Sequence, residues 1–224
     1  MFGLTTALDI FLKLFVLLAL IFYVLPTLIA LFFNTFSGKI EDIFIKKYNA
    51  KAESIVSAPG IIIHELSHYI MAKIFRYNIV SVKLFQLPTI ENKNIRGYVE
   101  YTYDSSSMIQ KAGSVLISIA PAITIPLINI EMIYFTYLNK GKSDFVLLLL
   151  ITIIVFILTV NGIHLSPQDW FEFRKGSFSY LLILLLIALM LVILLVITKN
   201  ITGYDILSKI PIDHLKDYFD WNWY

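Results

Sequence analysis

The stretch "APGIIIHELSHYIMAKIF", Ala58 to Phe75, places two histidines and a glutamate inside a run of apolar residues. In a helix, side chains four positions apart lie on one face, so His64 and His68 can both direct a ring nitrogen toward one point, with Glu65 beside them. The surrounding "GIII" and "YIMA" put apolar side chains on every face, which excludes a soluble amphipathic helix. The stretch therefore predicts a membrane helix that carries a polar site.

The composition of the whole chain agrees with a membrane location. Of its 224 residues, 58% are hydrophobic and 15% are charged, and the mean hydropathy is +0.78, which is too apolar for a soluble domain with a polar surface. A helix needs roughly 20 apolar residues to cross a bilayer. The chain is thus predicted to be an all-α polytopic membrane protein with about five transmembrane helices.

The elements are expected to form a single membrane domain over 1–224, with a small β-hairpin after the motif helix. "IVSVKLFQ" and "RGYVEYTY" alternate β-branched or aromatic residues with polar ones, and the turn-prone "ENKN" lies between them. The predicted elements are transmembrane helices over 8–33, 55–75, 108–138, 145–165 and 178–198, a β-hairpin over 79–103, and an interfacial tail over 199–224.

Several classes of function are disfavoured by composition. The chain has no cysteine, so disulfides and thiolate metal ligands are excluded. Its formal net charge of +2 comes without a basic stripe, which disfavours nucleic-acid binding. We expect a multi-pass integral protein of the cell membrane, with the lipid bilayer as its surroundings.

The motif "HELSH" has the spacing of a zinc site. In the pattern His-Glu-x-x-His, two histidines bind zinc, which lowers the pKa of a bound water, and the glutamate moves protons during hydrolysis. Ionisable residues inside a membrane helix are costly, so three of them within two turns indicate a function. We predict one Zn²⁺, with His64 and His68 as ligands and Glu65 as the catalytic residue.

A catalytic zinc usually takes a third protein ligand. Asp169 is favoured because the surrounding "NGIHLSPQDW", residues 161–170, should loosen the helix, and loosened backbone at membrane depth lines protein or a wet cavity. The alternatives at this point are His164, Glu131 and Glu172.

These motifs resemble the site-2 proteases, a family of intramembrane zinc metalloproteases. Family members carry His-Glu-x-x-His on one membrane helix, then a β-hairpin and a glycine-containing helix, and later an asparagine, a proline and a zinc-binding aspartate. The corresponding residues here are His64, Glu65, His68, Asn161, Pro167 and Asp169. Asp169 follows Pro167 more closely than in the family pattern and precedes Trp170, so the chain resembles a divergent member.

The resemblance implies regulated intramembrane proteolysis, in which a metal-activated water hydrolyses peptide bonds of membrane-spanning substrates, most simply single-span proteins. It implies that His64, His68 and Asp169 hold zinc, that Glu65 activates water, and that Asn161 binds the substrate backbone. The edge of the hairpin would then pair with an unwound substrate segment.

Two other functions stay open at this stage. One is a membrane zincin of the prenyl-protein protease type, in which a glutamate is the third ligand. The other is a zinc-binding membrane subunit without catalytic activity. An inactive relative would be expected to lose the general base before the ligands, and Glu65 is present.

Overall fold

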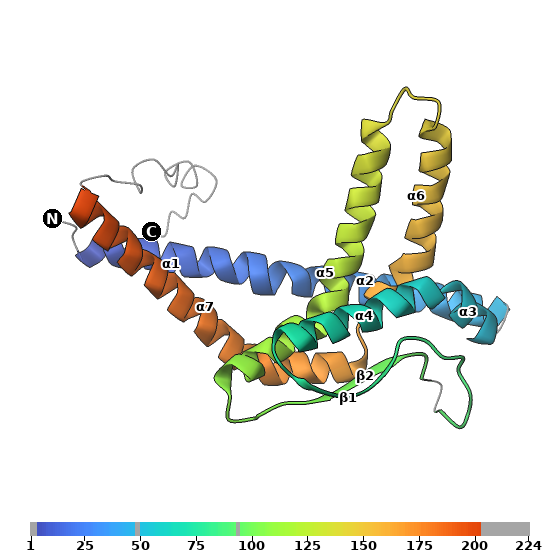
Figure 1. Cartoon of the computed structure of the whole chain (residues 1–224), viewed down its shortest axis with the longest axis horizontal. Helices are drawn as coiled ribbons and strands as arrows, with labels where there is room; N and C mark the ends of the chain where they lie inside the picture. Colours follow the sequence, from blue (N-terminus) through green and yellow to red (C-terminus); the bar gives the residue numbers. More distant parts are fainter. Residues whose placement is uncertain (1–3, 48–49, 93–94, 203–224) are drawn as a thin grey trace, which may run out of the picture. The chain divides into compact units, whose positions relative to one another are not determined.

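The computed structural model describes residues 4–47, 50–92 and 95–202 (Figure 1). The elements are α1 (Leu4–Ala19), a π-helical turn η1 (Leu20–Val24), α2 (Leu25–Lys47), α3 (Ala50–Val56), α4 (Ala58–Ile74), β1 (Asn78–Lys83), β2 (Tyr98–Thr102), α5 (Met108–Leu138), α6 (Phe145–Thr159), a 3-10 turn η2 (Val160–Ile163) and α7 (Pro167–Thr202). The chain divides into two compact units, Met1–Ala19 with Leu184–Tyr224, and Leu20–Ile183. All predicted site residues belong to the second unit.

Four helices in the described ranges are long and apolar enough to cross a membrane. They are Ala7–Phe36, Met108–Leu138, Phe145–Ile163 and Pro167–Ile201. The predicted mostly helical fold is therefore confirmed, and the four helices agree with the predicted membrane character. The motif helix α4 has 17 residues and is not among the four, so the predicted total of about five spans is not confirmed.

The last predicted span begins earlier than expected. Helix α7 starts at Pro167 rather than at residue 178, because the polar segment before the apolar run is itself helical. Of the predicted interfacial tail, residues 203–224 lie outside the described part of the chain.

Helices α5 and α6 form an antiparallel pair joined by a short connection (Figure 1). Their facing polar side chains bond across the interface. The hydroxyls of Thr136 and Thr152 are 2.7 Å apart, and the Asn129 side-chain amide donates to the Thr159 hydroxyl at 3.0 Å. Such bonds add to van der Waals packing between membrane helices, where the hydrophobic effect provides no attraction.

Two glycines bring α4 into backbone contact with η2. A Cβ at Gly162 would lie 2.3 Å from the Gly60 carbonyl oxygen, and a Cβ at Gly60 would lie 3.0 Å from the carbonyl oxygens of Leu158 and Thr159. No side chain fits between the two segments. The motif helix is therefore held directly against the backbone that follows α6.

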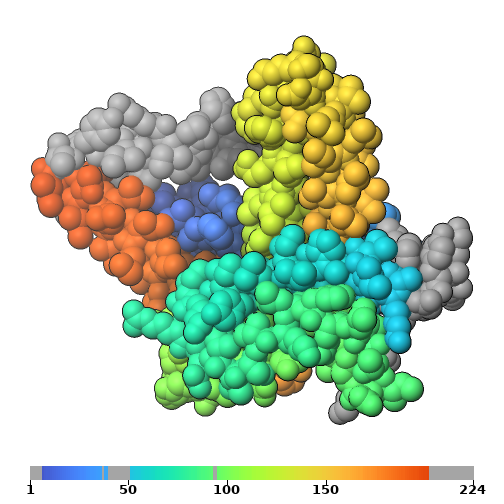
Figure 2. Space-filling model, turned by 45° about the vertical axis from the view of Figure 1, so that its right-hand side comes forward, coloured from blue at the N-terminus to red at the C-terminus, as the bar shows by residue number. Residues whose placement is uncertain are grey.

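The predicted β-hairpin, expected over 79–103, is confirmed as an antiparallel pair of β1 and β2 that begins at Asn78 and ends at Thr102. Val82 pairs with Val99, and the register shifts between Ile79 and Ser81. Figure 2 shows the hairpin and α4 side by side on one face of the molecule.

Tyr77, between α4 and β1, anchors the hairpin. Its buried ring packs edge-on against Tyr101 with centroids 5.2 Å apart and lies 4.9 Å from the ring of Tyr103. Its hydroxyl donates to the carbonyl of Gln110 at the start of α5. The hairpin is thereby fastened to two helices at once.

The end of α4 is a Schellman motif that turns the chain into β1. The amide of Tyr77 donates to the Ala72 carbonyl at 2.9 Å, and the amide of Arg76 donates to the Lys73 carbonyl at 3.0 Å. This geometry requires a left-handed residue, and Arg76 has φ 57°. Glycine adopts that conformation without the steric cost that a Cβ imposes.

We therefore predict that Arg76→Gly stabilises the protein. The relieved steric cost of about 1–2 kcal/mol exceeds the added backbone entropy of glycine, so the free energy of unfolding should rise by about 0.5–1 kcal/mol. Thermal unfolding in detergent measures the change. Lys73→Gly is the control, since Lys73 is exposed and helical and its replacement should destabilise. An equal loss in both variants would contradict the prediction.

Candidate metal centre

The structure brings together His64 and His68 of α4 and Asp169 in the first turn of α7. One ligand atom from each lies within 4.8 Å of the others. The two Nε2 atoms are 3.0 Å apart, His68 Nε2 is 3.3 Å from Asp169 Oδ1, and His64 Nε2 is 3.8 Å from Asp169 Oδ2. Residues about one hundred positions apart in the sequence thus meet at one point.

The opposite nitrogen of each histidine ring faces a backbone carbonyl. His64 Nδ1 is 2.7 Å from the Gly162 oxygen, and His68 Nδ1 is 2.7 Å from the Ile117 oxygen. A carbonyl oxygen can only accept a hydrogen bond, so both Nδ1 atoms carry the proton. In a neutral ring protonated on Nδ1, the Nε2 atom carries a free lone pair. This is the arrangement of histidines that bind a metal.

The centre of the cluster therefore contains only acceptors. Two imidazole lone pairs and a carboxylate face one another, with side-chain exposures of 12%, 7% and 15% for His64, His68 and Asp169. Buried acceptors without a donor are costly, so the arrangement calls for a cation or a shared proton. Two imidazole nitrogens and one carboxylate oxygen match the three-ligand set of catalytic zinc sites.

Asp169 is placed by a capping box at the start of α7. Its amide donates to the Ser166 hydroxyl at 3.2 Å, and its Oδ2 accepts from the Ser166 amide at 2.7 Å. Pro167 occupies the first helical position, where its missing N–H is not needed. Pro167 and Asp169 are thus the first and third residues of the helix, which explains the short spacing between them. Oδ1 remains directed to His68.

The irregular segment between η2 and α7 is supported by Asn34 of α2. The Leu165 amide donates to Asn34 Oδ1 at 2.8 Å, and Asn34 Nδ2 donates to the Leu165 carbonyl at 3.4 Å. Non-helical backbone in a membrane protein is tolerated where protein groups satisfy it. Asn34 therefore helps to hold the loop that presents Asp169.

Glu65 is buried beneath the hairpin. A Cβ at Gly97, immediately before β2, would lie 2.8 Å from Glu65 Cγ and 3.0 Å from the Leu84 carbonyl oxygen. Only glycine fits there without displacing a neighbour. The hairpin thus covers the residue that the motif predicts to be catalytic.

Asn161, on η2, lies next to Gly162, whose carbonyl orients His64. Its Nδ2 donates to the Ser57 hydroxyl at 3.2 Å, while its Oδ1 is buried and has no hydrogen-bond partner among the described residues. Asn161 therefore stands beside the metal cluster and presents a vacant acceptor.

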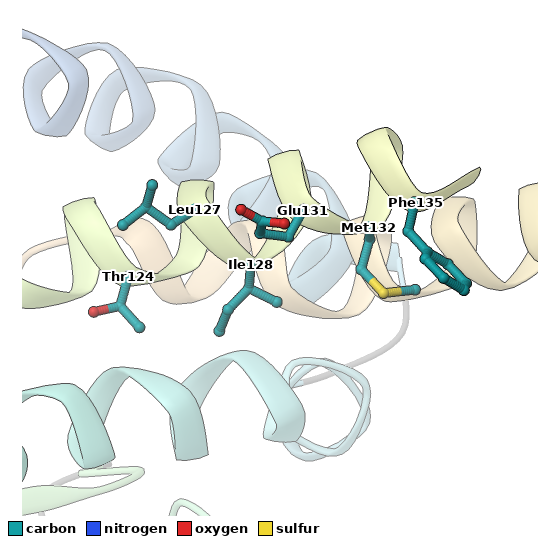
Figure 3. A pocket seen from close by; sticks show the side chains of 6 residues that line it. All are labelled: Thr124, Leu127, Ile128, Glu131, Met132 and Phe135. Atoms are coloured by element: carbon teal, nitrogen blue, oxygen red, sulfur yellow. The ribbon is translucent and has the colours of Figure 1, made fainter. Parts of the chain in front are cut away.

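The alternative third ligands lie outside the cluster. Glu172 extends along α7, where its carboxylate is 3.4 Å from Gln168 Nε2 and 3.8 Å from Lys175 Nζ. Glu131 is exposed on α5 and lines a separate open hollow of about 510 Å³ (Figure 3). The other residues lining this hollow are Thr124, Leu127, Ile128, Met132 and Phe135. His164 follows η2 and does not belong to the ligand group.

Two tyrosines of the hairpin region lie close to the site. Burial raises the pKa of Tyr101 well above its ordinary value, and the carboxylates of Glu172 and Asp169 add to the shift. Burial also raises the pKa of Tyr77. Both phenols are therefore neutral hydroxyls.

The sequence motifs predict the three clustered side chains but not the groups that orient them. The Gly162 and Ile117 carbonyls give no signal in a sequence pattern, because any residue can supply a carbonyl. The sequence signal for the capping box that places Asp169 is "SPQD".

No protein-family model, curated protein or solved structure matches the chain.

We predict that Asp169→Ala removes the metal. Loss of the carboxylate leaves two ligands, so zinc content should fall from about one ion per chain to near zero. Glu131→Gln and Glu172→Gln are controls that should keep the metal. Elemental analysis of the purified proteins measures the content. Loss of zinc in Glu172→Gln but not in Asp169→Ala would overturn the assignment.

The backbone contact between α4 and η2 gives a second test. In Gly162→Ala the added Cβ meets the Gly60 carbonyl, which should move η2 and remove the acceptor for His64 Nδ1. Zinc affinity, measured by chelator competition, should fall about 10–100-fold. Gly38→Ala is the control, since no atom of the described residues lies within 4 Å of a Cβ there. Equal affinities in the two variants would count against the contact's role.

Proposed function

We propose that this protein is a zinc-dependent intramembrane endopeptidase of the site-2 protease kind, which hydrolyses peptide bonds of membrane-spanning substrates. The observation that carries the proposal is the convergence of His64, His68 and Asp169 on one point, with Glu65 buried beside them. A second support is the set of four helices able to span a membrane.

Each residue has a role that its geometry supports. His64, His68 and Asp169 would hold the zinc, with their ring orientation set by backbone carbonyls. When bound, zinc supplies a Lewis acid that polarises a carbonyl and lowers the pKa of water. Glu65 accepts the proton from the attacking water and delivers it to the leaving amine nitrogen.

The hairpin and Asn161 would handle the substrate backbone. A helical substrate has its amides bonded internally, so a segment must become extended before attack. A two-stranded sheet leaves one edge of each strand unpaired, and an extended segment can add to such an edge. The unpartnered Oδ1 of Asn161 is an acceptor suited to a backbone N–H.

The alternatives have less support. A glutamate-ligated zincin needs Glu131 or Glu172 beside the histidines, and both lie outside the cluster. If the protein were a zinc-binding subunit without catalytic activity, the buried Glu65 beside the ligands would have no function.

We predict that Glu65→Gln keeps about one zinc per chain and loses cleavage by about 10²–10⁴-fold, because the amide cannot accept the proton. The assay uses wild type and variant reconstituted in liposomes with a set of single-span reporter proteins that carry different apolar segments. Glu131→Gln is the matched control and should cleave like wild type. Full activity in Glu65→Gln would refute the proposed role.

A further inference from the structure

A chain of hydrogen bonds connects the hairpin to Asn161. Arg96, which precedes Gly97, donates from a guanidinium nitrogen to Glu53 Oε2 at 2.6 Å. The Ser57 hydroxyl donates to Glu53 Oε1 at 2.7 Å, and Asn161 Nδ2 donates to the Ser57 hydroxyl at 3.2 Å. The chain links α3, η2 and the hairpin.

The direction of each bond follows from the groups. A carboxylate only accepts, so the single proton of Ser57 goes to Glu53 and its oxygen must accept from Asn161. This requires the NH₂ group of Asn161 to face Ser57. The amide oxygen is thereby left as the free end, and it is buried with no partner in the part of the chain that the structure describes.

The ion pair at the other end is largely removed from water. The Glu53 side chain is 3% exposed, and Arg96 is 29% exposed. Within the described residues, Glu53 Oε1 accepts from Ser57 and Oε2 accepts from Arg96, so displacement of Arg96 would take a charged donor from Oε2. A buried charge that loses its partner is strongly unfavourable, so Glu53 holds Arg96 at this position.

Arg96 in turn sets the position of the hairpin over Glu65. The Gln86 amide donates to the Arg96 carbonyl at 2.7 Å, which continues the pairing of the hairpin beyond its strands. The next residue, Gly97, lies against the Glu65 side chain. Displacement of Arg96 would therefore also move the backbone that covers Glu65.

We propose that Glu53, Ser57 and Arg96 are positioning residues. Together they fix the position of the hairpin over Glu65 and the orientation of the Asn161 amide. The Glu53–Arg96 ion pair seats the hairpin on Glu65, and Ser57 turns the Asn161 amide so that its oxygen accepts a hydrogen bond from a backbone N–H of an extended peptide. The second role rests on the proposed function, whereas the first concerns the protein without substrate.

The first role is tested by amide hydrogen exchange in detergent. Glu53→Gln removes the charge that holds Arg96, so exchange of residues 95–102 should become at least about tenfold faster. Zinc content should not change, because no ligand is altered. Glu91→Gln, an exposed position in the hairpin's connecting loop, is the control and should exchange like wild type. Unchanged exchange in Glu53→Gln would overturn this role.

The second role is tested at the Asn161 amide itself. In protein labelled with ¹⁵N-asparagine, the Asn161 side-chain resonance, assigned by its loss in Asn161→Asp, should shift in Ser57→Ala and return toward wild type in Ser57→Thr. The same resonance in wild type and Ser57→Ala would contradict the proposed orientation. Neither this measurement nor hydrogen exchange requires cleavage, so both remain decisive if proteolysis fails.

Kinetics then connect the orientation to substrate. With a cleaved reporter, Ser57→Ala should raise KM about tenfold with kcat within about twofold, and Ser57→Thr should restore KM. Asn161→Ala combined with Ser57→Ala should be no worse than Asn161→Ala alone, because both act through one acceptor. Additive effects of the two substitutions would refute action through Asn161.

Discussion

The contact of α4 with η2 at Gly60 and Gly162 is the constraint on which the candidate site depends. It brings the Gly162 carbonyl within hydrogen-bond distance of His64 Nδ1, which fixes the ring with Nε2 toward the cluster. The same turn carries Asn161 and leads into the loop before Asp169. Separation of α4 from η2 would therefore disturb His64, the loop that precedes Asp169, and Asn161, which is proposed to contact the substrate.

Asp169 has two roles, because it caps the start of α7 and also belongs to the candidate metal site. Asp169 closes the capping box of α7 with one carboxylate oxygen and faces His68 with the other. The position of the ligand is thus as well defined as the start of the helix. On the other side, Gly97 brings the hairpin backbone onto Glu65, so the predicted catalytic carboxylate is enclosed between a helix and a sheet.

Local patterns predict most of the elements and the pairing of the histidines. The span over 108–138 follows from apolar length, the hairpin from alternation, and the common face of His64 and His68 from helical periodicity. Apolar length alone indicates a span that starts near residue 178, whereas α7 begins at Pro167, because the polar residues after Pro167 are also helical. The Glu53–Arg96 pair was not predicted, since its partners are far apart in sequence and only packing brings them together.

The proposed chemistry requires that His64, His68 and Asp169 bind one zinc ion. The most direct test is a crystal structure of zinc-loaded protein with diffraction data collected on both sides of the zinc absorption edge. We expect one anomalous peak about 2.0–2.2 Å from the Nε2 atoms of both histidines and from an Asp169 carboxylate oxygen. A zinc peak bound to His64 and His68 with Glu172, or no peak between the two histidines, would contradict it.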